Sequence, residues 1–219
     1  MRDAEYLRQK YNERFRGPSG SWTSEDLKKC RSVAARIKHW TFRGNSSGLS
    51  MLDVGCALGY YTKAFFLEGF RSSGLDYSEV AIERARELHP ECTFIHADGF
   101  NPDPEKKYDL IFCKGFSGAN THDLSFVSDW SNKYINILKP GGKFVFAFTT
   151  DYSGKEKGEE TVNWTRKEIL DYTFLVNAEL TGIKNYYRYF ILSKIFAEIL
   201  SILKRKKFKN YFYIIFSKT

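Results

Sequence analysis

The chain has 219 residues and 42% hydrophobic content, which suits one domain with a modest appendage. It lacks both the run of about 20 apolar residues that spans a bilayer and the apolar N-terminus of a signal peptide, so we expect a cytoplasmic protein. The net charge of +8 is uneven: residues 1–43 and 182–219 are basic and either attract anionic partners or form solvated helix faces, whereas residues 44–181 carry a net charge of −6.

Residues 1–45 are predicted to form a helical cap. In the segment DAEYLRQKYNERF, Tyr6, Tyr11 and Phe15 recur near helical spacing. Thr23 follows a break containing glycine and proline, and it is a candidate N-cap for a second helix that ends near residue 40. The aromatic residues of the first helix either cover a ligand as a lid, with Tyr11 contacting a substrate, or pack against the rest of the fold.

Short apolar strands alternate with helices from residue 46 to residue 150. The predicted strands span 49–55, 71–78, 92–98, 108–115 and 143–150. The predicted helices span 60–69, 78–89 (begun by Ser78) and 122–138. Apolar strands linked by helices favour a parallel sheet that is covered on both faces.

The last third of the chain has a different pattern. The sequence TRKE at 165–168 is a capping box that opens a helix through residue 180. Two segments rich in aromatic and β-branched residues, 182–190 and 210–218, are predicted strands, with a helix between them. We therefore expect an α/β fold in which residues 46–219 form a seven-stranded, mostly parallel sheet with helices on both faces and the last strand antiparallel.

The segment 188–209 combines a wide apolar stripe with five Lys/Arg at positions 204–209. This composition is typical of a helix that lies on an anionic membrane surface, so peripheral membrane contact is one expectation. The alternative is a helix packed between the last two strands, with its basic end solvated near the helix C-terminus, where cations are favoured.

The segment LDVGCALGY places a glycine-rich turn directly after the first apolar strand. Such a turn lets a ligand approach the backbone at a helix N-terminus. A dinucleotide fingerprint G-x-G-x-x-G would put a glycine where Tyr60 stands, so the spacing of Gly55, Ala57 and Gly59 disfavours a nicotinamide dehydrogenase. Asp53 would repel a pyrophosphate and suits a ligand with an ammonium or sulfonium centre.

Two further carboxylates stand at the ends of the next two strands. Asp76 can bind both hydroxyls of a ribose, in a dinucleotide as well as in an adenosyl ligand. Asp98 can accept a hydrogen bond from an adenine amino group, and the backbone N–H of Gly99 or Phe100 can reach a ring nitrogen. The alternative role for these acids is to cap helices or turns.

The segments LDVGCALGY, GLDYS, HADGF, YDLIFCKG and LKPGGKFVF occur in an order and spacing that resemble the class I S-adenosylmethionine-dependent methyltransferases. The resemblance covers residues 49–150 well, and the layout after residue 160 fits the last strands of that family. Ala57 departs from the glycine that many members have. The resemblance implies a Rossmann-like fold, with S-adenosylmethionine as cofactor and S-adenosylhomocysteine as product.

The resemblance also implies contacts between this chain and the cofactor. They are with the methionine moiety (Asp53, Gly55, Ala57, Gly59), the ribose (Asp76), the adenine (Tyr77, Asp98, Gly99, Phe100) and the ammonium group (the carbonyl of Cys113 or Lys114).

Methyl transfer from a sulfonium is an in-line displacement, in which the protein mainly aligns donor and acceptor. A hydroxyl acceptor benefits from a general base, and His122, in the loop after the fourth strand, is the candidate. The alternative is that Thr121 or Asp123 caps the following helix and His122 is solvated. Tyr152, in the long polar loop after the fifth strand, is a candidate for acceptor binding.

The spacing of His89, Cys92 and His96 invites a metal site, which we reject. His89 precedes a helix-ending proline, and strand alternation points Cys92 and His96 to the same, usually packed face. A structural zinc site normally takes four ligands, and no fourth presents itself. The four cysteines include no CxxC pair, which favours a reducing compartment.

We expect a methyltransferase acting at oxygen or nitrogen of a small-molecule or sugar-containing, glycan-type acceptor. The NPPY-type tetrapeptide of amine-modifying DNA and protein members is replaced by CKGF, which weakens a nucleobase amine as the target. The enzymatic alternative is an RNA methyltransferase whose basic flanks contact phosphates. The non-enzymatic alternative, a binding module that has lost the cofactor, is disfavoured by the intact glycines and acids.

Overall fold

The computed structural model describes residues 4–16, 27–157, 161–185 and 210–219. Three expectations lie wholly or partly outside these ranges: the N-cap Thr23, the end of the strand 182–190, and the helical, membrane-binding segment 188–209. Among the residues described, no helix is both long enough and apolar enough to cross a membrane.

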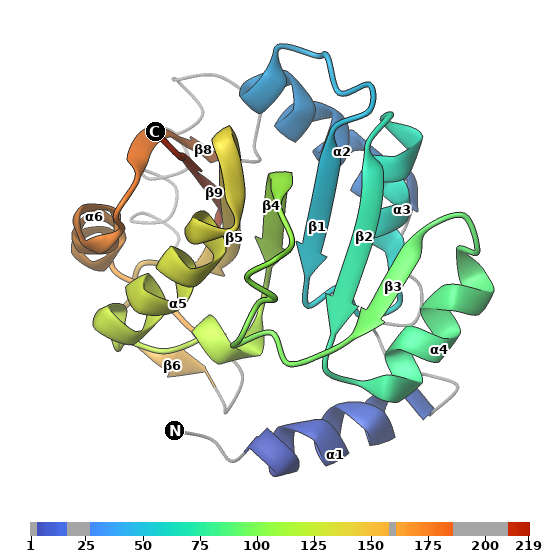
Figure 1. The fold of residues 1–219 in the computed structure, drawn as a ribbon. Coiled ribbons are helices and arrows are strands. Elements are labelled where there is room, and N and C mark those ends of the chain that lie inside the picture. The colour runs from blue at the N-terminus through green and yellow to red at the C-terminus, as the bar shows by residue number, and fades with distance from the viewer. Residues whose placement is uncertain (1–3, 17–26, 158–160, 186–209) are drawn as a thin grey trace.

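A seven-stranded sheet with the order β3-β2-β1-β4-β5-β9-β8 forms the centre of the fold (Figure 1). The strands are β1 (Ser50–Val54), β2 (Arg71–Asp76), β3 (Thr93–His96), β4 (Tyr108–Lys114), β5 (Leu138–Thr150), β8 (Glu179–Asn185) and β9 (Asn210–Ser217). The first five pair in parallel, and β9 runs antiparallel to both β5 and β8, so the expected mostly parallel sheet with an antiparallel last strand is confirmed. Strand order reverses between β1 and β4, and open α/β sheets bind ligands at the carboxyl ends of strands beside such a reversal.

Three of the six described α-helices begin at caps that the sequence predicts. The six are α1 (Ala4–Arg16), α2 (Leu27–Phe42), α3 (Tyr60–Leu67), α4 (Glu79–Leu88), α5 (Leu124–Asn136) and α6 (Arg166–Leu175), with a 3₁₀ turn at Ser117–Ala119. Ser78 caps α4, and Thr165 and Glu168 form the expected capping box of α6. Asp123 caps α5, which confirms one of the two caps considered for that helix.

The two faces of the sheet are buried against different helices. Neighbouring strand residues point to opposite faces, so Met51 packs in one cluster with Ile37 of α2, whereas Leu52 packs in another with Trp130 of α5 and Tyr172 of α6. The central strands β1 and β4 are buried along most of their length, so a ligand can reach them only at their ends.

Helix α1 lies at the end of the sheet toward which β1, β2 and β3 point (Figure 1). Phe15 is 4% exposed and packs with Leu58 and Ala81. The hydroxyl of Ser78 donates to Oδ1 of Asn12 at 2.7 Å. Helix α2 instead packs into the core of the sheet, and the division into a cap (1–45) and a domain (46–219) stays a prediction.

Three boundaries differ from expectation. The helix predicted through residue 180 ends at Leu175, and β8 begins at Glu179 because its backbone pairs with β9. Strand pairing therefore outweighs the helix propensity of this short segment. β5 begins at Leu138 rather than 143. The loop after β5 contains a short hairpin, β6 (Glu156–Lys157) and β7 (Thr161–Val162), which was not predicted.

Gly59 joins the glycine turn to α3 and lets that helix pack closely. Its φ is +78°, and a Cβ there would lie 2.5 Å from the ring of Phe94 and 3.3 Å from Ala85. Gly48 has a similar φ of +76°, but a Cβ there would meet nothing within 4 Å. Substitution by alanine at these two glycines therefore distinguishes the effect of backbone strain from that of steric overlap.

We expect Gly59→Ala to lower the free energy of unfolding by about 2–4 kcal/mol, because strain and overpacking add. Gly48→Ala should lower it by only about 1 kcal/mol, from strain alone. Urea unfolding of both variants measures the difference. Equal losses would show that close packing around Phe94 does not require Gly59.

Candidate functional site

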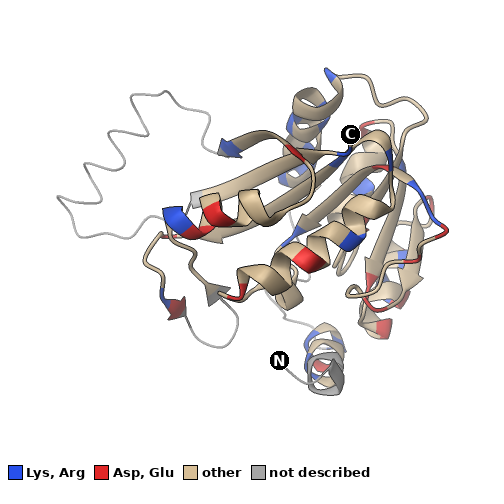
Figure 2. Cartoon of the chain, turned by 60° about the vertical axis from the view of Figure 1, so that its left-hand side comes forward, with Lys and Arg blue, Asp and Glu red and all other residues tan. Residues whose placement is uncertain are grey.

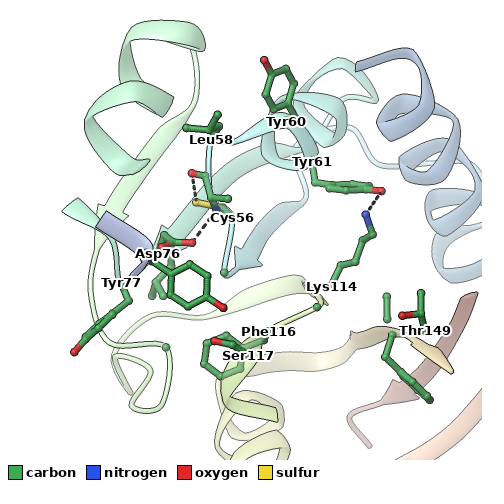
Figure 3. Close-up of a pocket in the computed structure, with 18 of the residues that line it drawn as sticks. Cys56, Leu58, Tyr60, Tyr61, Asp76, Tyr77, Lys114, Phe116, Ser117 and Thr149 are labelled. Atoms are coloured by element: carbon green, nitrogen blue, oxygen red, sulfur yellow. Dashed lines mark hydrogen bonds between the residues drawn. The ribbon is translucent and has the colours of Figure 1, made fainter. Parts of the chain in front are cut away.

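A cavity of about 480 Å³ crosses the carboxyl ends of the central strands. Its wall follows the order of the strands in the sheet: Asp98 (after β3), Asp76 (β2), Gly55 (after β1), Lys114 (β4), residues 147–149 (β5) and residues 211–213 (β9). Side chains from these elements point into one continuous space (Figure 3). The cavity therefore has a β3–β2–β1 half and a β4–β5–β9 half.

The turn after β1 is held against the end of β2. The N–H groups of Gly55 and Cys56 donate to the carbonyl oxygen of Leu75 at 2.8 and 3.0 Å. The N–H of Ala57 donates to Oδ2 of Asp76 at 2.8 Å. Ala57 has a φ of +48°, in the left-handed region that favours glycine, which explains why a glycine at this position would be less strained.

Asp76 is positioned to accept hydrogen bonds from a diol. Its Oδ1 accepts the N–H of Ser78 at 2.9 Å, while Oδ2 accepts that of Ala57. Burial raises the pKa of the Asp76 carboxyl, and the backbone hydrogen bonds of Ser78, Ala57 and Tyr77 partly offset this effect. A carboxylate has about four lone-pair sites, so Asp76 retains capacity for a further hydrogen bond from a ligand hydroxyl.

The loop after β3 is fixed to α5 and to an aromatic stack. The N–H of Phe100 donates to Oδ1 of Asp98 at 2.9 Å, and Nε1 of Trp130 donates to the carbonyl oxygen of Gly99 at 2.8 Å. The ring of Phe116 stacks on Trp130 with centroids 4.9 Å apart. A Cβ on Gly99 would lie 2.8 Å from the Phe116 ring. Glycine is thus required where this loop meets Phe116.

The β3–β2–β1 half of the cavity contains the two acids of the wall. Asp76 and Asp98 place carboxylates along this half, and Tyr77 and Phe116 add aromatic side chains to it. At Gly55, where a Cβ would lie 3.3 Å from Phe116, the bare backbone leaves room for a ligand to approach.

The β4–β5–β9 half is lined by aromatic side chains and a lysine. Nζ of Lys114 donates to the hydroxyl of Tyr61 at 2.8 Å. Phe148, Thr149 and Tyr211 continue the wall. Tyr11 and Arg14 of α1 also line the cavity.

The sequence-predicted residues fall into two groups. The cavity wall contains Tyr11, Gly55, Ala57, Asp76, Tyr77, Asp98, Gly99, Phe100 and Lys114. Asp53 and Cys113 are buried beneath the turn, where Asp53 is 3% exposed and accepts the hydroxyl of Thr62 at 2.8 Å. Gly59 shapes the turn from outside the wall. Ligand contact by these three residues stays a prediction.

His122 and Tyr152 also lie outside the cavity wall. Nδ1 of His122 is 2.5 Å from Oε1 of Glu168, and Oε2 of Glu168 accepts both the N–H and the hydroxyl of Thr165 at 2.7 Å. The ring of Tyr152 packs against Phe212, with centroids 5.5 Å apart. A general base at His122 and acceptor binding by Tyr152 stay predictions.

Several residues of the wall were not predicted from the sequence, among them Arg14, Tyr61 and Phe116. Tyr61 comes two positions after the glycine turn, and Phe116 comes directly after the end of β4 in CKGF. Their places in the motifs were visible, but which way these side chains point depends on tertiary packing.

Comparison with known proteins identifies the fold and its sequence family. Residues 45–190 match the family model described as a methyltransferase domain. Malonyl-[acyl-carrier protein] O-methyltransferase 1 of Ilyobacter polytropus is 32% identical over 110 residues, which are 48% of this chain and 39% of that protein. Trans-aconitate 2-methyltransferase of Enterobacter sp. is 42% identical over 65 residues, 28% of this chain and 25% of that protein.

The chain spans between 39% and 64% of the lengths of the malonyl-[acyl-carrier protein] methyltransferases that it matches. Among solved structures, magnesium protoporphyrin IX methyltransferase of Synechocystis with bound S-adenosylhomocysteine superposes with a TM-score of 0.68. The match covers 99% of this chain and 100% of that one at 15% identity, so it shows a shared fold.

We expect Asp76→Asn to weaken the binding of S-adenosylhomocysteine by about 1.5–3 kcal/mol, or roughly 10- to 150-fold, because hydrogen bonds to a charged acceptor are lost. Isothermal titration calorimetry measures the affinity. Asp103→Asn, in an exposed loop outside the cavity wall, is the matched control. Unchanged affinity in folded Asp76→Asn protein would mean that the ribose does not bind at Asp76.

Glu168 should make stability depend on pH. Burial raises the pKa of its carboxyl. The hydrogen bonds from Thr165 and the contact with His122 lower this pKa by more than burial raises it, so that it lies below the usual 4.5. A lowered folded-state pKa stabilises the protein above pH 4.5, and this contribution is lost as the pH falls through the folded-state value. Glu168→Gln should therefore destabilise the protein by about 1 kcal/mol at pH 7 and by less under acid conditions.

Urea unfolding of wild type and Glu168→Gln at several pH values measures this difference. Glu105→Gln removes an exposed carboxylate and serves as the control. A destabilisation that stayed constant down to low pH would show that the ionised carboxylate of Glu168 makes no contribution.

Proposed function

The chain belongs to the family of methyltransferase domains, the class I S-adenosylmethionine-dependent methyltransferases, and from this membership we propose that it methylates a small-molecule acceptor. One observation carries the proposal. A single cavity joins the β3–β2–β1 half, which would hold the adenosyl group, to the aromatic β4–β5–β9 half. A space of this size, partly covered by α1, suits a small ligand.

The residues of the β3–β2–β1 half would hold the cofactor. Asp76 would bind the ribose, Asp98 and the N–H of Phe100 or Gly99 the adenine, and the turn at Gly55 and Ala57 the amino-acid end. Rigid placement matters most here, because aligning donor and acceptor supplies much of the acceleration of such a displacement. The hydrogen bonds from Gly55, Cys56 and Ala57 to the end of β2 would provide that rigidity.

We infer that the acceptor is a small carboxylic acid. The names of two relatives contain aconitate, an organic acid, and a malonyl group, which keeps one free carboxyl when attached to a carrier. A carboxyl group with a pKa near 4 is already ionised at neutral pH, so its oxygen needs no general base. This agrees with a wall in which the described lining residues include no histidine.

The chemistry requires no proton transfer. Bound S-adenosylmethionine would supply a methyl group on its sulfonium sulfur. An ionised carboxylate oxygen would form the C–O bond as the C–S bond breaks, and the electron pair would stay on sulfur, giving a methyl ester and S-adenosylhomocysteine. If the acceptor were instead a hydroxyl, His122 would have to move from Glu168 to act as its base.

The other acceptors and partners that the sequence raised have less support. A sugar-containing acceptor finds no counterpart in the names of these relatives. For RNA, helix α2 carries Lys and Arg but no acid, and Figure 2 shows basic residues on several described helices. Two of the α2 residues, Arg31 and Lys38, form ion pairs with Glu68, which reduces the charge left for phosphates. Membrane contact through 188–209 concerns residues outside the described ranges and stays a prediction.

We expect purified protein to transfer labelled methyl from S-adenosylmethionine into the low-molecular-mass fraction of a cell extract. Mild alkali should release the label as methanol, because esters hydrolyse under conditions that leave methyl ethers and methylamines intact. Asp76→Asn protein is the negative control. Label that appeared in RNA, with a rate falling steeply as salt is added, would contradict the proposal.

A further inference from the structure

Strand β8 is the last strand at one edge of the sheet, beyond β9 (Figure 1). One side of β8 pairs with β9 over residues 179–185. In the sheet that the described residues form, the other side of β8 presents backbone N–H and C=O groups that a further strand can pair with. Residues 179–184 are exposed, apart from the half-buried Gly182. This edge therefore offers a place for a strand from another chain.

A bulge at Thr181 decides which side chains of β8 share a face. Leu180 pairs with Phe216 and Ile183 pairs with Ile214, and the register shifts by one residue between the two pairs. Both β9 partners belong to the apolar cluster that includes residues of α6. Since paired residues point to the same face of a sheet, Leu180 and Ile183 both lie on the α6 face. In an unbroken strand, residues three apart would lie on opposite faces.

The two ends of the same segment carry opposite charges on the other face of the sheet. Glu179 pairs with Ser217, and Lys184 pairs with Tyr213. Tyr213 belongs to the cluster that includes residues of α2, and Ser217, four positions further along β9, points the same way. Glu179 and Lys184 therefore lie on the α2 face, and both side chains are exposed.

The segment ELTGIK at 179–184 is therefore complementary to itself. Two copies can pair in antiparallel orientation about a two-fold axis at the centre of the segment. Leu180 of one copy then lies opposite Ile183 of the other, on the α6 face. Glu179 likewise lies opposite Lys184, on the α2 face. A two-fold interface requires a patch that matches itself after rotation, and each of these contacts occurs twice. Without the bulge, the opposed side chains would point to opposite faces.

The end of α6 adds apolar surface next to β8 in the chain. Phe174 is 85% exposed and Leu175 is 47% exposed, whereas Leu180 and Ile183 are 41% and 37% exposed. Exposed apolar side chains that occur together are typical of protein-interaction surfaces. A stable interface buries about 800 Å² on each partner, more than a six-residue strand edge supplies alone. The end of α6 is the described surface closest along the chain that can supplement it.

We propose that the outer edge of β8 binds β8 of a second copy of this chain, in antiparallel orientation, and forms a two-fold symmetric dimer with one continuous sheet. Backbone pairing supplies the contact, while the opposed charges and apolar pairs fix its register. The interface residues lie outside the cavity wall. The inference is therefore independent of the proposed function.

Sedimentation equilibrium over a range of protein concentrations measures the dimer dissociation constant. Glu179→Lys puts a lysine opposite Lys184, and Lys184→Glu puts a glutamate opposite Glu179. Each single variant should raise the dissociation constant roughly 10-fold, because two attractive pairs become repulsive. The double variant Glu179→Lys/Lys184→Glu should restore it. A mixture of the two single variants should form a mixed dimer that is tighter than either alone, because opposite charges then face each other at both ends.

Glu105→Lys and Lys107→Glu make the same charge changes in an exposed loop and should leave the dissociation constant unchanged. Thermal unfolding at low protein concentration checks that each variant is folded, as expected for exposed positions. A wild type that sediments as a monomer throughout would overturn the proposal. A dimer whose dissociation constant is the same in both single variants as in the wild type would also overturn it, as would a mixed dimer no tighter than the single variants.

Discussion

The site depends on one set of hydrogen bonds, those that fasten the turn after β1 to the end of β2. The carbonyl of Leu75 accepts two N–H groups of the turn, and the Asp76 carboxylate accepts a third. The same carboxylate also caps the backbone at Ser78, from which α4 begins. The acid expected to bind a ribose therefore also holds together the two loops that surround it. Burial raises its pKa, because removing the charged form of Asp76 from water is unfavourable.

Much of the fold follows from local sequence, because its elements are marked by strong signals. Alternation of apolar strands with capped helices predicted the parallel core, and Ser78 and the Thr165–Glu168 box began helices as expected. The errors fall where tertiary pairing competes with local propensity. Residues 179–180 were assigned to a helix, but their pairing with β9 places them in β8.

The candidate site could be predicted from sequence in its cofactor half and much less in its acceptor half. Asp76, Asp98 and the glycine turn occupy strand ends, and strand ends in a parallel sheet converge on one edge. The direction of a side chain such as Tyr61 or Lys114 depends on which neighbours pack around it, and no periodicity reveals that. For the same reason, the sequence did not reveal that His122 contacts Glu168, and its role as a base stays a prediction.

The central claim is that one cavity holds the cofactor across the strand ends in the order Asp98, Asp76, Gly55 and Lys114. A crystal structure of the protein with S-adenosylhomocysteine tests it most directly. The account predicts adenine near Asp98, both ribose hydroxyls on Asp76 and the amino-acid end beside the turn at Gly55. A nucleoside bound elsewhere, or bound here with its ribose away from Asp76, would contradict it.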